Sequence, residues 1–263
     1  MGVLLLAILG AMLVIVSLGV ISQKLKSAGN HLLGNFTSAL IVVFTIIGVV
    51  LFNKKFNKIG PDQYGFHFKK IGKSFAIGFN TALLIIVLVL LVACCIFGVQ
   101  LRWLGLYDNF QTPLMLSVLA TFAIAVWEEV FFRGLLFTTL HNHKFGFQKS
   151  AIISTALFSL VHWSSFDMQT TSWLWYLGIG LIGYLLAVLY LYTRSIWTPV
   201  FFHFAWNFLV DLMVDSENEI GIFSIKDYKE DAILIDNIEV FFLGVASIVI
   251  FSLRHKISGF TLK

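Results

Sequence analysis

Charged residues are scarce in this chain. Asp, Glu, Lys and Arg make up 12% of its 263 residues, whereas hydrophobic residues make up 59%. Soluble domains carry about 25% charged residues, so this composition, with a mean hydropathy of +0.90, excludes an ordinary soluble protein and indicates an integral membrane protein. No Gly/Ser-rich linker and no long polar stretch divides the chain, so we expect one transmembrane domain over residues 1–263.

Several familiar signatures are also missing. The two cysteines, Cys94 and Cys95, are adjacent in an apolar run, which excludes a disulfide framework and a CxxC metal site. The chain has no GxSxG nucleophile elbow and no HExxH zinc motif. Lys and Arg are absent before the first hydrophobic run, so that run lacks the basic start of a secretory signal. We expect it to be an uncleaved first span.

Eight hydrophobic runs approach the roughly 20 residues that a helix needs to cross a bilayer. They predict an all-α, polytopic bundle of about eight transmembrane helices, with seven as the main alternative because the fifth and eighth runs are short. The runs cover residues 2–22, 32–52, 75–98, 114–139, 150–163, 173–192, 197–214 and 238–253.

The distribution of basic residues predicts the orientation. Six lysines and one acid lie between the second and third runs. With that side cytoplasmic, both termini are cytoplasmic, and so are twelve of the eighteen Lys and Arg residues. The acidic loop 215–237 then lies outside. This assignment follows the positive-inside rule, and we expect a multi-pass protein of the cell membrane, such as a bacterial inner membrane.

A few polar residues interrupt the predicted spans. Charged groups at that depth are costly, and they usually face a bundle interior or a wet cavity. From the helical rise, each lies roughly 14–20 Å from its cytoplasmic loop. We therefore expect one constellation inside a motif-bearing core at about 112–214. Its residues are Glu128, Glu129, Arg133, His162, His203 and Asn207, with Asp211 one turn further on.

These residues predict hydrolysis by an activated water. Glu129 and Arg133 are four apart, the favourable order for an ion pair, which leaves Glu128 as a general base. Glu128 and His162 could hold and deprotonate a water, and His203 and Asn207 could stabilise an oxyanion. Two alternatives stay open here: ordinary structural bonds and ion pairs, and a zinc site made by Glu128, His162 and His203.

The ordered motifs Glu-Glu-x-x-x-Arg at 128–133, Phe-x-x-x-His at 158–162 and His-x-x-x-Asn at 203–207 resemble those of the CPBP family. This family groups type II CAAX prenyl endopeptidases with bacteriocin-processing and immunity proteins. The resemblance spans 80 residues, and the chain before residue 112 shows no comparable signature. Eight spans are also what the eukaryotic and archaeal CAAX members have.

The resemblance implies an intramembrane endopeptidase and a role for each motif residue. Glu128 would activate water with His162, Glu129 and Arg133 would orient the site, and His203 and Asn207 would form the oxyanion hole. It also implies no metal cofactor, with Zn²⁺ as the alternative. The expected partners are a peptide or lipidated-protein substrate and the lipid bilayer, with no nucleic acid.

Two other functions are compatible with the same residues. The first is a non-catalytic membrane scaffold, for immunity or regulation, that binds a peptide in the same cavity. The second is a proton-coupled transporter, although the sequence shows no pair of broken helices in matching halves. The residues do not predict the substrate. The resemblance implies a CAAX protein, or a bacteriocin or other peptide that the cell matures or to which it is immune.

Overall fold

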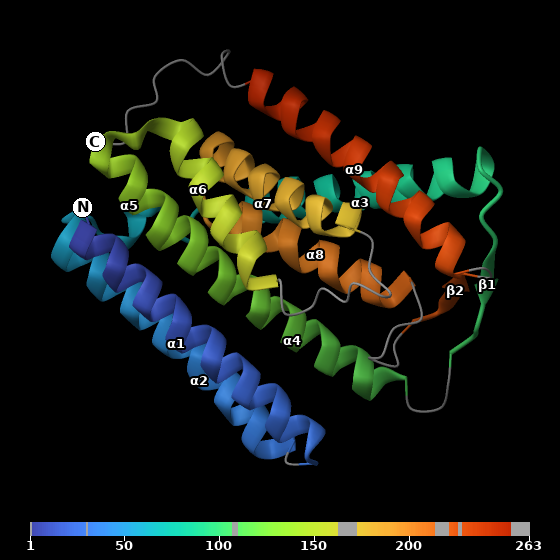
Figure 1. Cartoon of the computed structure of the whole chain (residues 1–263), viewed down its shortest axis with the longest axis horizontal. Coiled ribbons are helices and arrows are strands. Elements are labelled where there is room, and N and C mark those ends of the chain that lie inside the picture. Colours follow the sequence, from blue (N-terminus) through green and yellow to red (C-terminus); the bar gives the residue numbers. More distant parts are fainter. Residues whose placement is uncertain are drawn as a thin grey trace.

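The structure is a bundle of long helices (Figure 1). It is a computed structural model that describes residues 2–29, 31–106, 110–162, 173–213, 221–225 and 228–253. Every predicted run overlaps a long helix, so the all-α polytopic bundle is confirmed. The long helices are α1 Gly2–Ser27, α2 His31–Phe52, α3 Ile71–Cys95, α4 Gln111–Glu129, α6 Gly146–Val161, α7 Trp173–Thr193, α8 Trp197–Met213 and α9 Tyr228–Leu253.

Shorter and irregular helical segments join these rods. A 3₁₀ turn, η2 (Pro61–Tyr64), and a π-helical segment, η1 (Asn53–Asn57), lie in the connection between α2 and α3. After α4 the chain continues through π-helical η3 (Val130–Phe137), α5 (Thr138–Leu140) and η4 (His141–Phe145). The helix breaks there, because Lys144 and Gly146 take positive φ values of 67° and 72°, and α6 then runs back.

Five helical stretches of the described chain are long and apolar enough to cross a membrane: Thr37–Asn57, Ile71–Cys95, Gln111–Val161, Trp173–Thr193 and Ile233–Leu253. The third contains the break before α6, so it holds two antiparallel helices. Large apolar side chains on the outer helices are exposed, for example Leu13 at 65%, Phe44 at 64% and Ile248 at 68%. Lipid, rather than water, solvates such surfaces. The number of spans and the side that faces the cytoplasm stay predictions.

The motif-bearing helices lie inside the bundle. Glu128, Glu129, Arg133 and His203 are at most 7% exposed, whereas Ile248 on α9 is 68% exposed. Helix α8 packs against α3 and α4, while α6 packs against α7 and η3 (Figure 1). The α1–α2 pair lies on the outside and packs against α4 and η3 through α2. The chain regions that carry the candidate residues are therefore surrounded by other helices.

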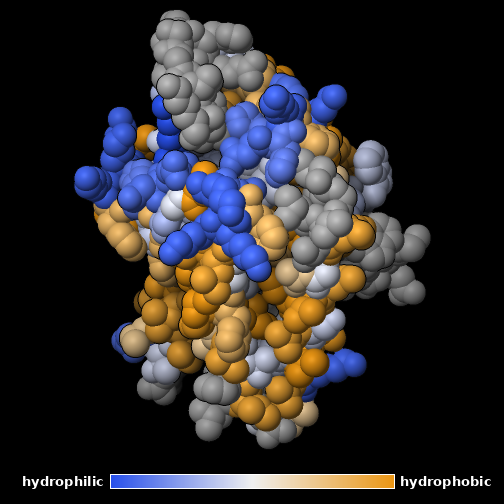
Figure 2. Space-filling model, turned by 90° about the vertical axis from the view of Figure 1, so that its left-hand side faces the viewer, coloured by the Kyte–Doolittle hydropathy of each residue, from blue (hydrophilic) through white to orange (hydrophobic). Residues whose placement is uncertain are grey.

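Polar residues gather where the helices end. Figure 2 shows hydrophilic residues collected toward the top of one face, above a surface of hydrophobic residues. The connection 53–70 contacts both α5 and the α7–α8 turn, because Asn57 bonds to Thr139 and the Ile196 amide donates to the Gly65 carbonyl. These three predicted cytoplasmic loops thus lie at the same end of the bundle.

Two features differ from the prediction. Strands β1 (Leu101–Trp103) and β2 (Phe223–Ile225), both expected to be loop, pair in an antiparallel ribbon in which Leu101 faces Ile225. Helix α9 begins at Tyr228, so the expected acidic loop 215–237 is partly helical. Carboxylates are favourable near a helix N-terminus, and an acidic sequence therefore does not prevent this helix.

Candidate active site

The six motif residues come from helices that pack against one another. Helix α4 contacts α8, and η3 contacts α6. Glu128 and Glu129 are the last two residues of α4, Arg133 lies in η3, His162 caps the C-terminus of α6, and His203 and Asn207 lie one turn apart on α8.

Glu129 and Arg133 form the ion pair expected from their spacing. Arg133 Nη1 donates to Glu129 Oε1 at 2.8 Å, and both side chains are completely buried. Arg133 Nη2 donates to the Gly183 carbonyl on α7 at 2.7 Å, and its guanidinium lies 4.9 Å from the Phe158 ring centroid. A buried ion pair is stable only when its geometry is good and further hydrogen bonds are made. Here Glu129 Oε1 and both Nη atoms of Arg133 have partners, whereas Glu129 Oε2 and Arg133 Nε have none in the described part of the chain.

His203 is attached to the same carboxylate. Its Nδ1 lies 3.0 Å from Glu129 Oε1, and it is 4% exposed. A carboxylate paired with an arginine can only accept hydrogen bonds, so Nδ1 must carry a proton. Glu129 therefore fixes both Arg133 and the ring of His203. We call Glu129, Arg133 and the Nδ1 edge of His203 the closed side of the cluster.

Glu128 faces the other edge of the His203 ring. Its Oε2 lies 3.8 Å from His203 Nε2, which is too far for a hydrogen bond. This oxygen is buried and has no hydrogen-bond partner in the described part of the chain. Buried polar atoms nearly always have a partner, so the orphaned oxygen marks a place for a water or a substrate group. We call Glu128 and the Nε2 edge of His203 the open side.

Charge balance indicates where one proton lies. The cluster holds two carboxylates and one guanidinium in a buried environment, which leaves one negative charge if His203 is neutral. An uncompensated buried charge is strongly unfavourable. The cluster is neutral when one further proton is bound either by His203 Nε2 or by Glu128, the two groups that face each other at 3.8 Å.

His162 and Asn207 lie beside this cluster without bonding to it. His162 Nδ1 is 2.8 Å from the Phe158 carbonyl, so this nitrogen donates and Nε2 is left to accept. Both His162 and Asn207 are partly exposed. Within the described residues neither side chain makes a hydrogen bond to Glu128. The predicted pairing of Glu128 with His162 around a water therefore stays a prediction.

The predicted zinc alternative stays a prediction. Glu128, His162 and His203 are all described, and no group of three or more His, Cys, Asp or Glu side chains in the described part of the chain is arranged to hold a metal ion. Glu128 and His203 are close, and the bond between His162 Nδ1 and the Phe158 carbonyl leaves His162 Nε2 available.

Two further residues build the site and gave no signal of it in the sequence. Phe158, part of a motif, lies between Arg133 and His162, with its ring centroid 4.7 Å from that of His162. Gly183 supplies the carbonyl that accepts from Arg133, and a Cβ there would lie 3.1 Å from Phe158 Cδ1. A buried glycine in a hydrophobic helix gives no signal of either role.

Comparisons with known proteins concern the segment of the chain that carries the candidate site. Residues 110–209 match the family model "Type II CAAX prenyl endopeptidase Rce1-like". All six motif residues lie inside this segment, whereas α1, α2 and α3 lie before it.

A curated relative points in the same direction. The Bacillus subtilis (strain 168) protein described as "Putative membrane peptidase YdiL" is 31% identical over 109 residues. The aligned region covers 41% of this chain and 41% of the relative. The similarity therefore concerns less than half of either protein.

Proposed function

We propose that this protein is an intramembrane endopeptidase in which Glu128 activates a water that attacks a peptide bond. The observation that carries the proposal is the asymmetry of the two adjacent carboxylates. Glu129 accepts from Arg133 and from His203 through Oε1, whereas Glu128 makes no hydrogen bond to the described residues and faces His203 Nε2 at 3.8 Å. A base must be able to take a proton, and the Glu128 carboxylate is bonded to neither an arginine nor a histidine. The Rce1-like match over 110–209 supports the same activity.

The reaction proceeds without a covalent intermediate. Glu128 removes a proton from the water, and the resulting hydroxide attacks the amide carbon to form a tetrahedral oxyanion. The imidazolium of His203 faces the open side and donates a hydrogen bond to that oxyanion. The C–N bond then breaks as Glu128 returns the proton to the leaving amine nitrogen, which leaves a carboxylic acid and an amine. The acid then gives its proton to the amine or to water.

His162 and Asn207 take supporting parts in this proposal. His162 Nε2 accepts a hydrogen bond from the water, because Nδ1 is already committed to the Phe158 carbonyl. The Asn207 amide lies one turn after His203 on α8 and supplies a second donor to the oxyanion. Removal of one donor that stabilises the oxyanion lowers the rate of a hydrolytic enzyme by about 10²–10³-fold.

The substrate is a peptide or a lipidated protein that enters from the membrane. We propose the cell membrane of a bacterium as the location, and peptide maturation or self-immunity as the biological role. The hydrocarbon core of the membrane supplies no water for hydrolysis of a peptide bond. The essential element of the site is therefore a buried carboxylate that holds a water molecule.

The test compares two intramembrane carboxylates. Glu128→Gln keeps the shape of the side chain and removes the base, so we expect cleavage to fall by about 10²–10⁴-fold. Glu239→Gln is the matched control, because Glu239 is half-buried on α9, next to Gly178, and lies outside the motifs. The measurement is the set of new peptide N-termini in membranes of cells that express each variant at equal level.

The outcome separates an enzyme from a scaffold. Loss of the same cleavage products in Glu128→Gln, with retention in Glu239→Gln, supports the proposal. Unchanged products in correctly inserted Glu128→Gln protein would end it, and an unchanged phenotype would then favour a non-catalytic scaffold.

The proposed chemistry needs no metal cofactor. Cleavage by the purified protein should therefore change less than about twofold after dialysis against a chelator, because the proton on His203 already supplies the positive charge that faces the oxyanion. Recovery of a lost activity by added Zn²⁺, and not by Mg²⁺, would contradict this and favour a metal-activated water.

A further inference from the structure

We propose that Asn53, in the connection between α2 and α3, is a positioning residue that holds the π-helical segment η3 in register and so aims Arg133 at Glu129. The kinetic part of this inference rests on the proposed function. Asn53 precedes the Rce1-like segment 110–209, and the sequence showed no motif near it.

The π-helical geometry of η3 creates the need for outside support. A π-helix shifts the backbone hydrogen bonds from i+4 to i+5, and such segments are often found at functional sites. Three consecutive carbonyls of η3 accept bonds from side chains. Ser154 donates to the Phe132 carbonyl at 3.0 Å, Thr138 to the Arg133 carbonyl at 2.8 Å, and Asn53 to the Gly134 carbonyl at 2.8 Å.

These three bonds approach η3 from different parts of the chain. Thr138 belongs to the same rod, Ser154 to α6, and Asn53 to the end of the α1–α2 side of the molecule. Because η3 accepts hydrogen bonds from two separate neighbours, it cannot rotate about its axis without breaking one of these hydrogen bonds. The rotation of η3 sets the direction of Arg133, and Arg133 in turn holds the carboxylate that orients His203.

Asn53 is built for this role and not for solvent contact. It is completely buried, and its Oδ1 accepts from Asn57 Nδ2 at 2.7 Å. Asn57 Nδ2 also donates to Thr139 Oγ1 at 2.7 Å. Both ends of the Asn53 amide are therefore satisfied, and a fully satisfied buried polar group specifies one arrangement of its surroundings.

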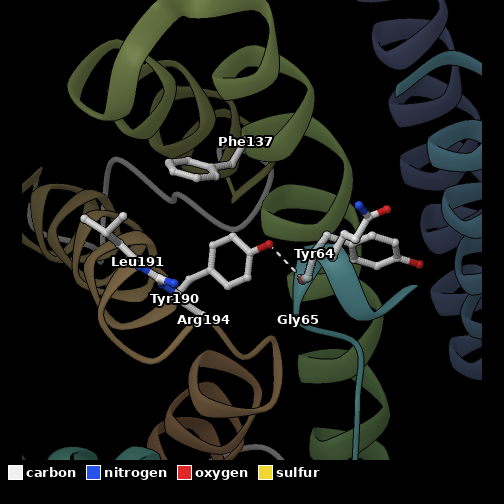
Figure 3. A pocket seen from close by; sticks show the side chains of 7 residues that line it. Tyr64, Gly65, Phe137, Tyr190, Leu191 and Arg194 are labelled. Atoms are coloured by element: carbon white, nitrogen blue, oxygen red, sulfur yellow. Dashed lines mark hydrogen bonds between the residues drawn. The ribbon is translucent and has the colours of Figure 1, made fainter. Parts of the chain in front are cut away.

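The far end of the same connection is also fixed. Tyr190 on α7 donates to the Tyr64 carbonyl at 2.7 Å (Figure 3). The residue after Tyr64, Gly65, has a φ of 81°, and a Cβ there would lie 2.9 Å from the Arg194 carbonyl. Figure 3 shows a pocket between this turn and Phe137 at the end of η3. Since the connection is anchored beyond η1, Asn53 is a fixed point from which to hold η3.

The experiment uses the full chain in detergent micelles or liposomes and two readouts. Asn53→Leu removes the donor at nearly constant volume, and Thr45→Val is the matched control. Thr45 is a buried hydroxyl on the adjacent helix α2 and has no hydrogen-bond partner in the described residues. Asn57→Ala is the second variant, which weakens the support of Asn53 without touching the bond to Gly134.

The first readout is amide hydrogen exchange of residues 130–138, which does not depend on a substrate. We expect Asn53→Leu to speed exchange there by about tenfold, because a lost bond admits local opening, with no change in α9. The second readout is kinetic. We expect kcat to fall about 10–100-fold at nearly constant KM, since misplaced catalytic groups affect the transition state most. Asn57→Ala should show both effects more weakly, and Thr45→Val neither.

Each outcome decides the inference. Faster exchange in η3 with an unchanged kcat would show that Asn53 only stabilises the fold. Equally faster exchange along the whole chain would show the same, and either result would overturn the inference. If Asn53→Leu does not fold, Asn57→Ala gives the same two readouts on a milder change, and no effect of Asn57→Ala on either would also overturn it. If Glu128→Gln cleaves like the wild type, the proposed function fails, whereas local exchange in η3 still reports whether Asn53 holds this segment.

Discussion

The closed and open sides of the buried cluster share one histidine and differ in what their polar atoms do. On the closed side, Glu129 Oε1 accepts from Arg133 and His203, and Arg133 also bonds to the Gly183 carbonyl. On the open side, Glu128 makes no hydrogen bond to the described residues, and its Oε2 lies 3.8 Å from His203 Nε2. The Glu129 carboxylate is held in an ion pair, whereas the Glu128 carboxylate is left available for chemistry. The two sides should therefore respond in opposite ways to substitution.

The largest effect on stability is expected on the closed side. Arg133→Met removes the partner of a completely buried carboxylate, so the free energy of unfolding should fall by about 3–5 kcal/mol. Thermal or denaturant unfolding in micelles measures it. Glu128→Gln, on the open side, should change the unfolding free energy by less than about 1 kcal/mol, because no bond is lost.

A double variant tests whether the unpaired Glu129 carboxylate causes this loss of stability. Arg133→Met with Glu129→Gln removes both charges, and it should recover part of the stability that Arg133→Met loses, because the cost comes mainly from the charge left behind. If the double variant loses as much unfolding free energy as the two single variants together, the unpaired carboxylate is not the main cause of the loss. An Arg133→Met variant as stable as the wild type would show the same.

Much of the fold follows from the sequence because lipid imposes simple rules. Hydrophobic runs of span length must be helical to satisfy their backbone, and all eight runs overlap a helix. What the runs could not predict are features decided by contacts between distant segments. The β1–β2 ribbon needs two loops more than a hundred residues apart to meet. The π-helical turns of η3 are likewise stabilised by side chains from α6 and from residue 53.

The candidate site was predicted in part for the same reason. The Glu129–Arg133 pair is local, and its spacing in one helix was sufficient to predict the bond. The contact of Glu129 with His203 joins residues 74 positions apart, and only the shared depth of the two helices indicated it. Asn53 and Gly183 gave no signal, because a buried asparagine and a buried glycine look ordinary until their partners are known.

The smallest expected effect is a change in unfolding free energy at Gly183, whose carbonyl accepts from Arg133 on the closed side. Alanine favours a helix over glycine by about 0.5–1 kcal/mol, so an Ala substitution on α7 should stabilise the protein wherever there is room. At Gly180 there is room, since the nearest atom to an added Cβ is Ser159 Oγ at 3.5 Å. At Gly183 the added Cβ would lie 3.1 Å from Phe158 and 3.3 Å from Thr155, so α6 and α7 must separate slightly.

That separation would act on the closed side through one bond. Moving α7 away lengthens the 2.7 Å contact of Arg133 with the Gly183 carbonyl and loosens Phe158 under the guanidinium. We therefore expect Gly183→Ala to lower the unfolding free energy by about 1 kcal/mol and Gly180→Ala to leave it unchanged or raise it, measured by thermal unfolding in the same micelles. Equal behaviour of the two variants would mean that close contact between α6 and α7 is not what holds Arg133, and that Glu129 alone defines the closed side.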